Sequence, residues 1–119
     1  MANITDFFID SLYNISKREL EHKYVEIAQR CILDYLGVTL AGASMLSSEM
    51  NSYLGNFLNE GGSCTVIGMN SKTTLYNAVF VNGFNAHVAE LDDGHRYAAV
   101  HPGAPIISAL LPLLEGNRV

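Results

Sequence analysis

The sequence predicts an all-α domain with at most one short pair of strands. Apolar residues recur at three-and-four spacing along most of the chain, which is the spacing that lines one face of a helix. One short β-branched run, at residues 64–68, lies between glycines and suits a strand or an extended segment. No internal repeat and no low-complexity linker divides the 119 residues, so they fit a single domain.

Two helices are expected in the N-terminal third. Thr5 can cap the first, and Ser16 with Glu19 has the spacing of a capping box that would start the second. The second keeps helical spacing to Val38, and from Cys31 onward nearly every face is apolar. A helix that is apolar all round is expected to be buried, with Cys31 as a reduced core thiol.

Three further helices are expected, over residues 47 or 48 to 59, from 71 or 73 to the acidic run near 90, and from 105 to 114. Gly61 and Gly62 follow the first of these and break it. The second carries small residues that suit close helix packing. Pro105 opens the third, because proline favours the first turn of a helix.

Composition and charge exclude several functions. The chain is 49% apolar and 16% charged, which is rich in apolar residues for a domain that keeps a large share of its surface in water. Some of these residues are therefore expected to face another domain or subunit. Twelve acids against seven bases give a net charge of −5, and only Lys72, Arg96 and Arg118 are basic after Arg30. Binding to nucleic acid or to an anionic membrane is not expected.

The cysteines and the N-terminus predict a cytoplasmic protein. Cys31 and Cys64 do not have the spacing of metal ligands, so reduced thiols are expected. Asp6 and Asp10 interrupt the N-terminus, which excludes a signal peptide. The longest apolar run, over residues 38–46, is too short to span a bilayer.

The most informative stretch places three carboxylates, two histidines and one arginine within twelve residues. It runs Glu90-Leu91-Asp92-Asp93-Gly94-His95-Arg96 and then reaches His101-Pro102-Gly103. Such groups are costly to bury in apolar surroundings unless something pairs or uses them. A cleft that moves protons on and off a small acidic molecule would use them, since histidine titrates near neutrality and a carboxylate can orient it.

Two other interpretations of this stretch stay open. Histidine and aspartate also bind metals, but the spacing of His95 and His101 matches no strong zinc signature and no thiol takes part. A solvated acidic loop at a helix end would have the same composition, and Asp-Gly is itself a turn signal. If the helix continues to Gly94, Asp92 and Asp93 point about 100° apart, so only one of them would hydrogen-bond a histidine.

Several motifs together resemble the MmgE/PrpD family. In chain order they are Asp34-Tyr35-Leu36-Gly37-Val38 with Leu40-Ala41-Gly42, Cys64-Thr65-Val66-Ile67-Gly68, Asn82-Gly83-Phe84-Asn85-Ala86-His87, Glu90-Leu91-Asp92-Asp93-Gly94-His95 and His101-Pro102-Gly103-Ala104. The family's usual form has an Asn-Gly helix end with histidine, an Asp-Phe-Asp-Asp-Thr-like run and a His-Pro-Ser or His-Pro-Gly helix start. The motifs agree in order and spacing over nearly the whole chain.

The resemblance implies a fold, a chemistry and a site. It makes residues 1–119 the N-terminal, bundle-like segment of a large helical domain, which in the family is joined to a smaller α+β domain and typically forms homodimers. Members such as 2-methylcitrate dehydratase, cis-aconitate decarboxylase and iminodisuccinate epimerase act on small di- or tricarboxylates without a metal or an organic cofactor. By motif position the catalytic residues would be His101, Asp92 and Asp93, and the substrate-binding residues His95, Arg96 and Glu90. His101 would also precede a helix start, where backbone amides favour anions.

Two departures from the family and the length of the chain bear on function. Glu90 stands where the family often has aspartate, and Gly94 stands where threonine is common. Family enzymes are several times longer, and later segments supply lysines and a further histidine. Arg96 is the one cation near the cluster here, which suits a polyanionic substrate poorly. The chain is expected to be a truncated segment of a lyase or isomerase that is inactive alone. The alternative is a non-catalytic helical oligomerisation module or split subunit.

Overall fold

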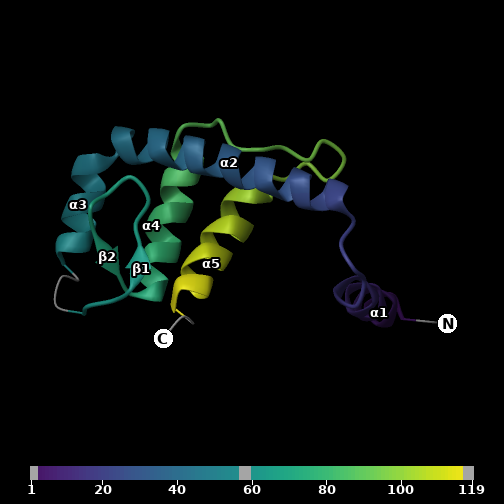
Figure 1. Cartoon of the computed structure of the whole chain (residues 1–119). Coiled ribbons are helices and arrows are strands. Elements are labelled where there is room, and N and C mark those ends of the chain that lie inside the picture. Colours follow the sequence, from purple (N-terminus) through teal and green to yellow (C-terminus); the bar gives the residue numbers. More distant parts are fainter. Residues whose placement is uncertain (1–2, 57–59, 117–119) are drawn as a thin grey trace.

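The computed structural model describes residues 3–56 and 60–116 and is mostly helical (Figure 1). The elements in chain order are α1 (Ile4–Ser16), α2 (His22–Met45), α3 (Ser47–Gly55), β1 (Cys64–Thr65), β2 (Lys72–Thr73), α4 (Leu75–Val88) and α5 (Gly103–Gly116). The strands pair antiparallel, with Cys64 opposite Thr73 and Thr65 opposite Lys72. They form the one sheet in the described ranges, so the all-α prediction with a single short strand pair is confirmed.

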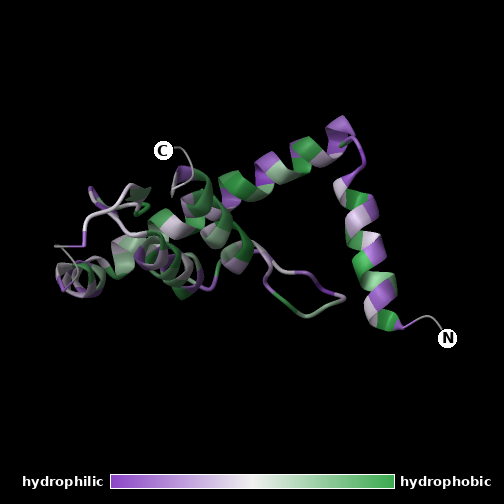
Figure 2. Cartoon of the chain, turned by 90° about the horizontal axis from the view of Figure 1, so that it is seen from below, coloured by the Kyte–Doolittle hydropathy of each residue, from purple (hydrophilic) through white to green (hydrophobic). Residues whose placement is uncertain are grey.

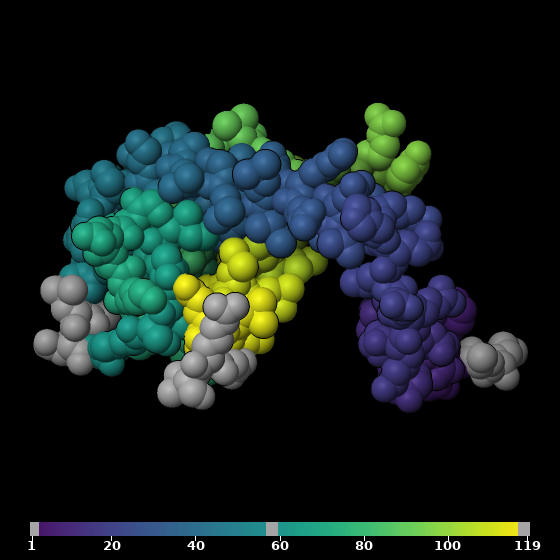
Figure 3. Space-filling model, viewed as in Figure 1, coloured from purple at the N-terminus to yellow at the C-terminus, as the bar shows by residue number. Residues whose placement is uncertain are grey.

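Helices α2, α4 and α5 form the packed body of the molecule. α4 and α5 lie side by side across α2, and α3 and the strand pair lie at the opposite end of α2 from α1 (Figure 1). The Glu115 carboxylate ties α5 to β1, because it accepts from the Thr65 amide and hydroxyl at 2.7 Å each. α1 lies apart from this body, beyond the N-terminal end of α2 (Figure 3).

Two small apolar clusters hold the body together. One joins α3, the segment after β1 and α4 through the buried residues Met50, Leu54, Val66 and Val81. The other joins α2, α4 and α5 through Tyr35, Ala86 and Ala104. Between α2 and α4 the backbones approach closely at Gly42, where a Cβ atom would overlap the carbonyl group of Asn85. These contacts fix the position of the C-terminal end of α4 relative to the start of α5.

The first two helices begin at residues other than those predicted. Asn3 caps α1, since its side-chain oxygen accepts from the Thr5 amide at 3.1 Å. Ser16 belongs to the end of α1, where its hydroxyl donates to the Tyr13 carbonyl at 2.8 Å. α2 begins at His22 without a side-chain cap. The predicted capping box was wrong because the serine hydroxyl is used by the preceding helix.

The next two helices also differ at their ends. α3 begins at Ser47 as predicted but ends at Gly55, and the expected continuation to 59 falls partly on residues 57–59, outside the described ranges. Residues 72 and 73 form β2, so α4 begins later than predicted. Its cap is Thr74, whose hydroxyl accepts from the Asn77 amide at 3.4 Å.

The N-terminal half of α2 is exposed. The stretch predicted to be buried, from Cys31 onward, is buried only from Tyr35, at Tyr35, Val38, Thr39, Gly42 and Ala43. Cys31 is a free, exposed cysteine, and Leu33 is 71% exposed. Apolar bands run along this half of α2 and along α1, where Phe7 is also 71% exposed (Figure 2). Within the described residues no single helix is both long and apolar enough to cross a membrane, and α2 and α3 meet both conditions only together, as a pair bent by 82°.

Candidate functional site

The acidic run lies on a loop that follows α4, and α4 ends earlier than predicted. α4 ends at Val88, and Glu90 takes a left-handed conformation with φ of 52°. The Glu90 amide donates to the His87 carbonyl at 3.1 Å, which closes this turn. A non-glycine residue rarely adopts such a φ. The helix therefore does not continue to Gly94, and the two aspartates follow the turn.

Asp92 is the centre of the candidate site. Its side chain is only 3% exposed, and its Oδ2 atom accepts a hydrogen bond from His87 Nδ1 at 2.8 Å. The same oxygen lies 3.7 Å from Nδ1 of His101. The two imidazole rings are about half exposed, with centroids 6.0 Å apart. A buried carboxylate thus lies between two accessible histidines.

The charges in this cluster favour an ion pair. Burial raises the pKa of Asp92, but the hydrogen bond from His87, a backbone hydrogen bond and the charges of His87 and His101 together outweigh it, so the pKa lies below its ordinary value. The hydrogen bond to Asp92, followed by the Asp92 charge, raises the pKa of His87 above its ordinary value. Both shifts favour an imidazolium at His87 beside a carboxylate at Asp92.

Asp93 contacts different groups. Its carboxylate Oδ1 accepts from the Gly103 amide at 2.8 Å, and its backbone carbonyl accepts from Nδ1 of His101 at 2.7 Å. Asp93 therefore caps α5 and holds the His101 ring. The prediction that only one of the two aspartate side chains hydrogen-bonds a histidine is confirmed, although through the turn at Glu90 and not through helical spacing. The first amide of α5, which we expected to favour an external anion, is bound by Asp93.

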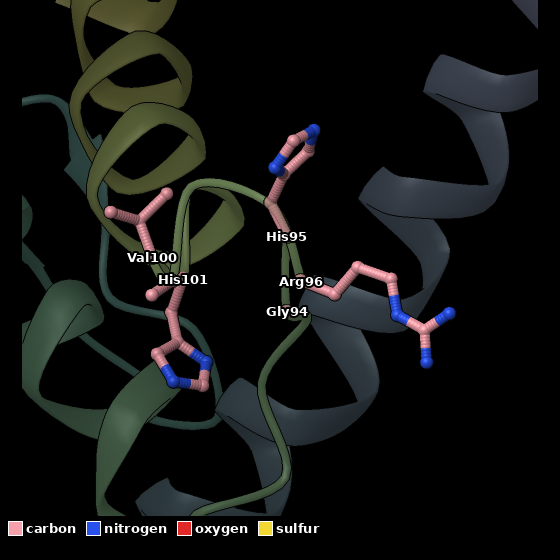
Figure 4. A pocket seen from close by; sticks show the side chains of 6 residues that line it. Gly94, His95, Arg96, Val100 and His101 are labelled. Atoms are coloured by element: carbon pink, nitrogen blue, oxygen red, sulfur yellow. The ribbon is translucent and has the colours of Figure 1, made fainter.

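Residues between Asp93 and His101 form an exposed loop with its own internal bonds (Figure 4). The His95 amide donates to the Val100 carbonyl at 2.8 Å, and His95 Nδ1 accepts from the Ala98 amide at 3.1 Å. The side chains of His95 and Arg96 point away from His101 (Figure 4). They line a shallow pocket of about 270 Å³ with neighbouring loop residues and His101. These two predicted substrate-binding residues thus lie outside the Asp92 cluster, and Glu90 is an exposed residue at the end of α4.

A second, larger cavity opens over the Asp92 cluster. It measures about 410 Å³ and is lined by Gly83, His87, Asp92, His101, Ala104 and Pro105. The walls come from the second half of α4, the loop and the first turn of α5. A volume of this order suits a small organic ligand. No group of three or more His, Cys, Asp or Glu side chains in the described ranges has the arrangement to hold a metal ion.

The comparisons with known proteins decide the family. Residues 8–116 match the MmgE/PrpD N-terminal domain. The chain belongs to the MmgE/PrpD family. It is 25% identical over 114 residues to the cis-aconitate decarboxylase-like protein oryM of Aspergillus oryzae, and the alignment covers 96% of this chain and 24% of that protein. The chain thus spans about a quarter of the length of this relative. No solved structure matches the chain significantly.

Two residues of the motif at positions 82–87 make different contacts in the structure. Asn82 holds the segment around β1, because its side chain accepts from the Ile67 amide at 2.9 Å and donates to the Thr65 carbonyl at 3.0 Å. His87, from the same motif, turns instead to Asp92. His87 is not among the site residues predicted from the sequence. The sequence feature that could have identified His87 is its position five residues before Asp92. The two side chains come into contact because the chain turns at Glu90.

Proposed function

We propose that this chain supplies the acid–base part of the active site of a lyase or isomerase that acts on a small di- or tricarboxylate, similar to 2-methylcitrate dehydratase. The observation that carries this proposal is the cavity in which the buried carboxylate of Asp92 meets the imidazoles of His87 and His101. Proton transfer next to a substrate carboxylate needs a group that both takes and gives a proton near neutral pH, and histidine is such a group.

His101 is the proposed proton-exchanging residue. A carbonyl oxygen only accepts hydrogen bonds, so the contact with the Asp93 carbonyl places a proton on Nδ1 of His101. In the neutral ring Nε2 then carries a lone pair that can take a proton from the carbon beside a carboxylate. The same nitrogen can return the proton to a leaving hydroxyl or to another carbon. The nearby Asp92 carboxylate stabilises the imidazolium formed in between.

The other predicted site residues receive supporting tasks in this proposal. Asp93 positions His101 through its carbonyl and the start of α5 through its carboxylate. His95, Arg96 and Glu90 lie around the cluster, and we propose that they contact substrate at the rim of the complete site. A metal or an organic cofactor has no step in this chemistry.

We further propose that the chain alone is inactive. Arg96 is the one arginine on the loop, and a polyanionic substrate is bound best by several cations and hydrogen-bond donors. The exposed apolar side chains of α1 and α2 would be covered by further protein, most simply in a homodimer. We also propose a cytoplasmic location without nucleic-acid or membrane partners, because the chain has a net charge of −5 and few basic residues.

A second candidate is a non-catalytic helical module that only associates with itself or with another chain. The apolar residues that α1 leaves exposed favour it, since Ile4 is 82% and Phe7 is 71% exposed. Such faces on a small domain mark interaction surfaces. In this case the Asp92 cluster would serve only to join the end of α4 to α5.

Turnover measurements separate the two candidates. Loss of 2-methylcitrate and of cis-aconitate is followed for the chain alone and for the chain co-expressed with the remaining part of the Aspergillus oryzae relative. Turnover that needs both parts and that falls in a His101→Ala variant supports the enzyme segment. A stable complex without turnover favours the non-catalytic module. Ordinary enzyme rates from the chain alone would refute its proposed incompleteness.

A further inference from the structure

We infer that the two histidines of the cavity divide the work, so that His87 is the cation that binds a carboxylate group of the substrate while His101 exchanges the proton. This inference rests on the proposed function and gives His87 a binding role. It names the substrate feature that His87 recognises, a carboxylate next to the reacting carbon.

Asp92 lies closer to His87 than to His101. Its Oδ2 atom is 2.8 Å from Nδ1 of His87 but 3.7 Å from Nδ1 of His101. The shorter contact is a charge-assisted hydrogen bond, whereas the nearest partner of His101 is the uncharged carbonyl of Asp93 at 2.7 Å. Coulomb attraction also falls with distance. The carboxylate therefore stabilises the imidazolium at His87 more than at His101.

The other charges that face His87 also favour its protonated form. Glu90 lies on the turn after α4, and its charge also raises the pKa of His87. Across the cavity α5 contributes Ala104 and Pro105, which carry no charge. His101 is the one other titratable lining residue besides Asp92. The surroundings of His87 thus favour its protonated form, and two adjacent imidazoliums would repel each other.

The Nε2 atom of His87 can contact a ligand in the cavity. Within residues 3–56 and 60–116 no protein hydrogen bond reaches Nε2 of either His87 or His101, and both rings line the cavity. In the imidazolium form of His87, Nε2–H is a donor for an anionic oxygen. With ring centroids 6.0 Å apart, a compact acid can place a carboxylate at His87 and a neighbouring carbon at His101.

The test uses the 119-residue chain and propane-1,2,3-tricarboxylate as the probe. The imidazole nitrogens are followed by NMR through a pH titration, with and without the probe at equal ionic strength. We expect Nε2 of His87 to shift when the probe binds and the pKa of His87 to rise further, because a second carboxylate then stabilises its charge. His22, which pairs with Glu26 on α2, should not respond.

Two variants make the test specific. His87→Gln should weaken probe binding about three- to tenfold near pH 6, the scale of a charge-assisted hydrogen bond at a partly exposed group. His87→Lys should retain binding near about pH 9, where the wild-type histidine has lost its charge and lysine has not. His22→Gln is the matched control and should bind as the wild type does. A purely structural His87 would not produce this pH profile.

The outcomes distinguish this inference from the proposed function. If the probe shifts His101 but His87→Gln binds it as tightly as the wild type, the assignment of His87 is overturned while the proposed function stands. If neither ring responds to the probe, the carboxylate-binding role of His87 is overturned, and the turnover measurements with the remaining part present decide the proposed function. Weaker binding in His87→Gln together with pH-independent binding in His87→Lys supports the division of roles.

Discussion

Replacing Asp93 with alanine removes the cap of α5 and should lower the free energy of unfolding by about 1 to 2 kcal/mol. A side-chain cap of a helix N-terminus contributes about 1 kcal/mol, and a negative charge there adds about 0.3 to 1 kcal/mol. The bond in question joins Asp93 Oδ1 to the Gly103 amide at 2.8 Å. Asp93→Asn keeps the accepting oxygen and should lose only the charge contribution.

The same interaction can be removed from the other side. A Cβ atom at Gly103 would lie 2.5 Å from Asp93 Oδ1, so Gly103→Ala should displace the carboxylate and destabilise the chain. Gly94→Ala is the matched control, because nothing lies within 4 Å of a Cβ there. In an Asp93→Ala background Gly103→Ala should cost almost nothing, which gives a coupling energy of about 1 kcal/mol.

Urea unfolding followed by far-ultraviolet circular dichroism measures these free energies, provided that the unfolding slopes of the variants agree. Asp93→Ala within about 0.3 kcal/mol of the wild type, or additive effects of the two changes, would refute the capping argument. The contact between Asp93 and Gly103 would then contribute nothing to the stability of α5.

Three further predictions follow from the site and the core. In the complete enzyme His101→Ala should lower turnover by about 10²-fold or more, and unchanged turnover with intact folding would disprove its role. The ion pair of His87 and Asp92 should stabilise the fold most at pH values between about the ordinary pKa of Asp92 and about the ordinary pKa of His87. Its contribution to the free energy of unfolding decreases as pH rises through the raised pKa of His87. It also decreases as pH falls through the lowered pKa of Asp92. His87→Gln should flatten this part of a stability–pH curve measured by urea unfolding. Gly42→Ala should cost about 3 kcal/mol or more in thermal or urea unfolding, because its Cβ would meet the backbone of α4, whereas Gly37→Ala in the same helix has open space and should be neutral or stabilising.

The helices could be predicted from the sequence because apolar spacing reports which face of a segment is covered. The boundaries were less predictable, since Ser16 satisfies its hydroxyl within α1 and not at the start of α2. The exposure of Cys31 was also missed. Helical spacing alone does not say whether the face that carries Cys31 is covered by this chain or by other protein.

The residues of the candidate site could be predicted to lie close together in the sequence, but the contacts between their side chains could not be predicted. The acidic run and His101 were selected because charged groups concentrate there in an otherwise apolar region. The contact between His87 and Asp92 depends on a left-handed residue, Glu90, whose side chain gives no sequence signal for that conformation. The different partners of Asp92 and Asp93 depend on where α5 begins, which tertiary packing decides.

The adjacent residues Asp92 and Asp93 connect the end of α4 to the start of α5. Asp92 bonds to the last turn of α4, and Asp93 bonds to the first amide of α5. The distance between the two histidines is therefore set by how α5 sits against α4. The outer face of α5 is apolar and about half exposed, with Ile106, Leu110, Leu113 and Leu114 on it. Any protein that packs on that face and shifts α5 would therefore also change the spacing of His87 and His101.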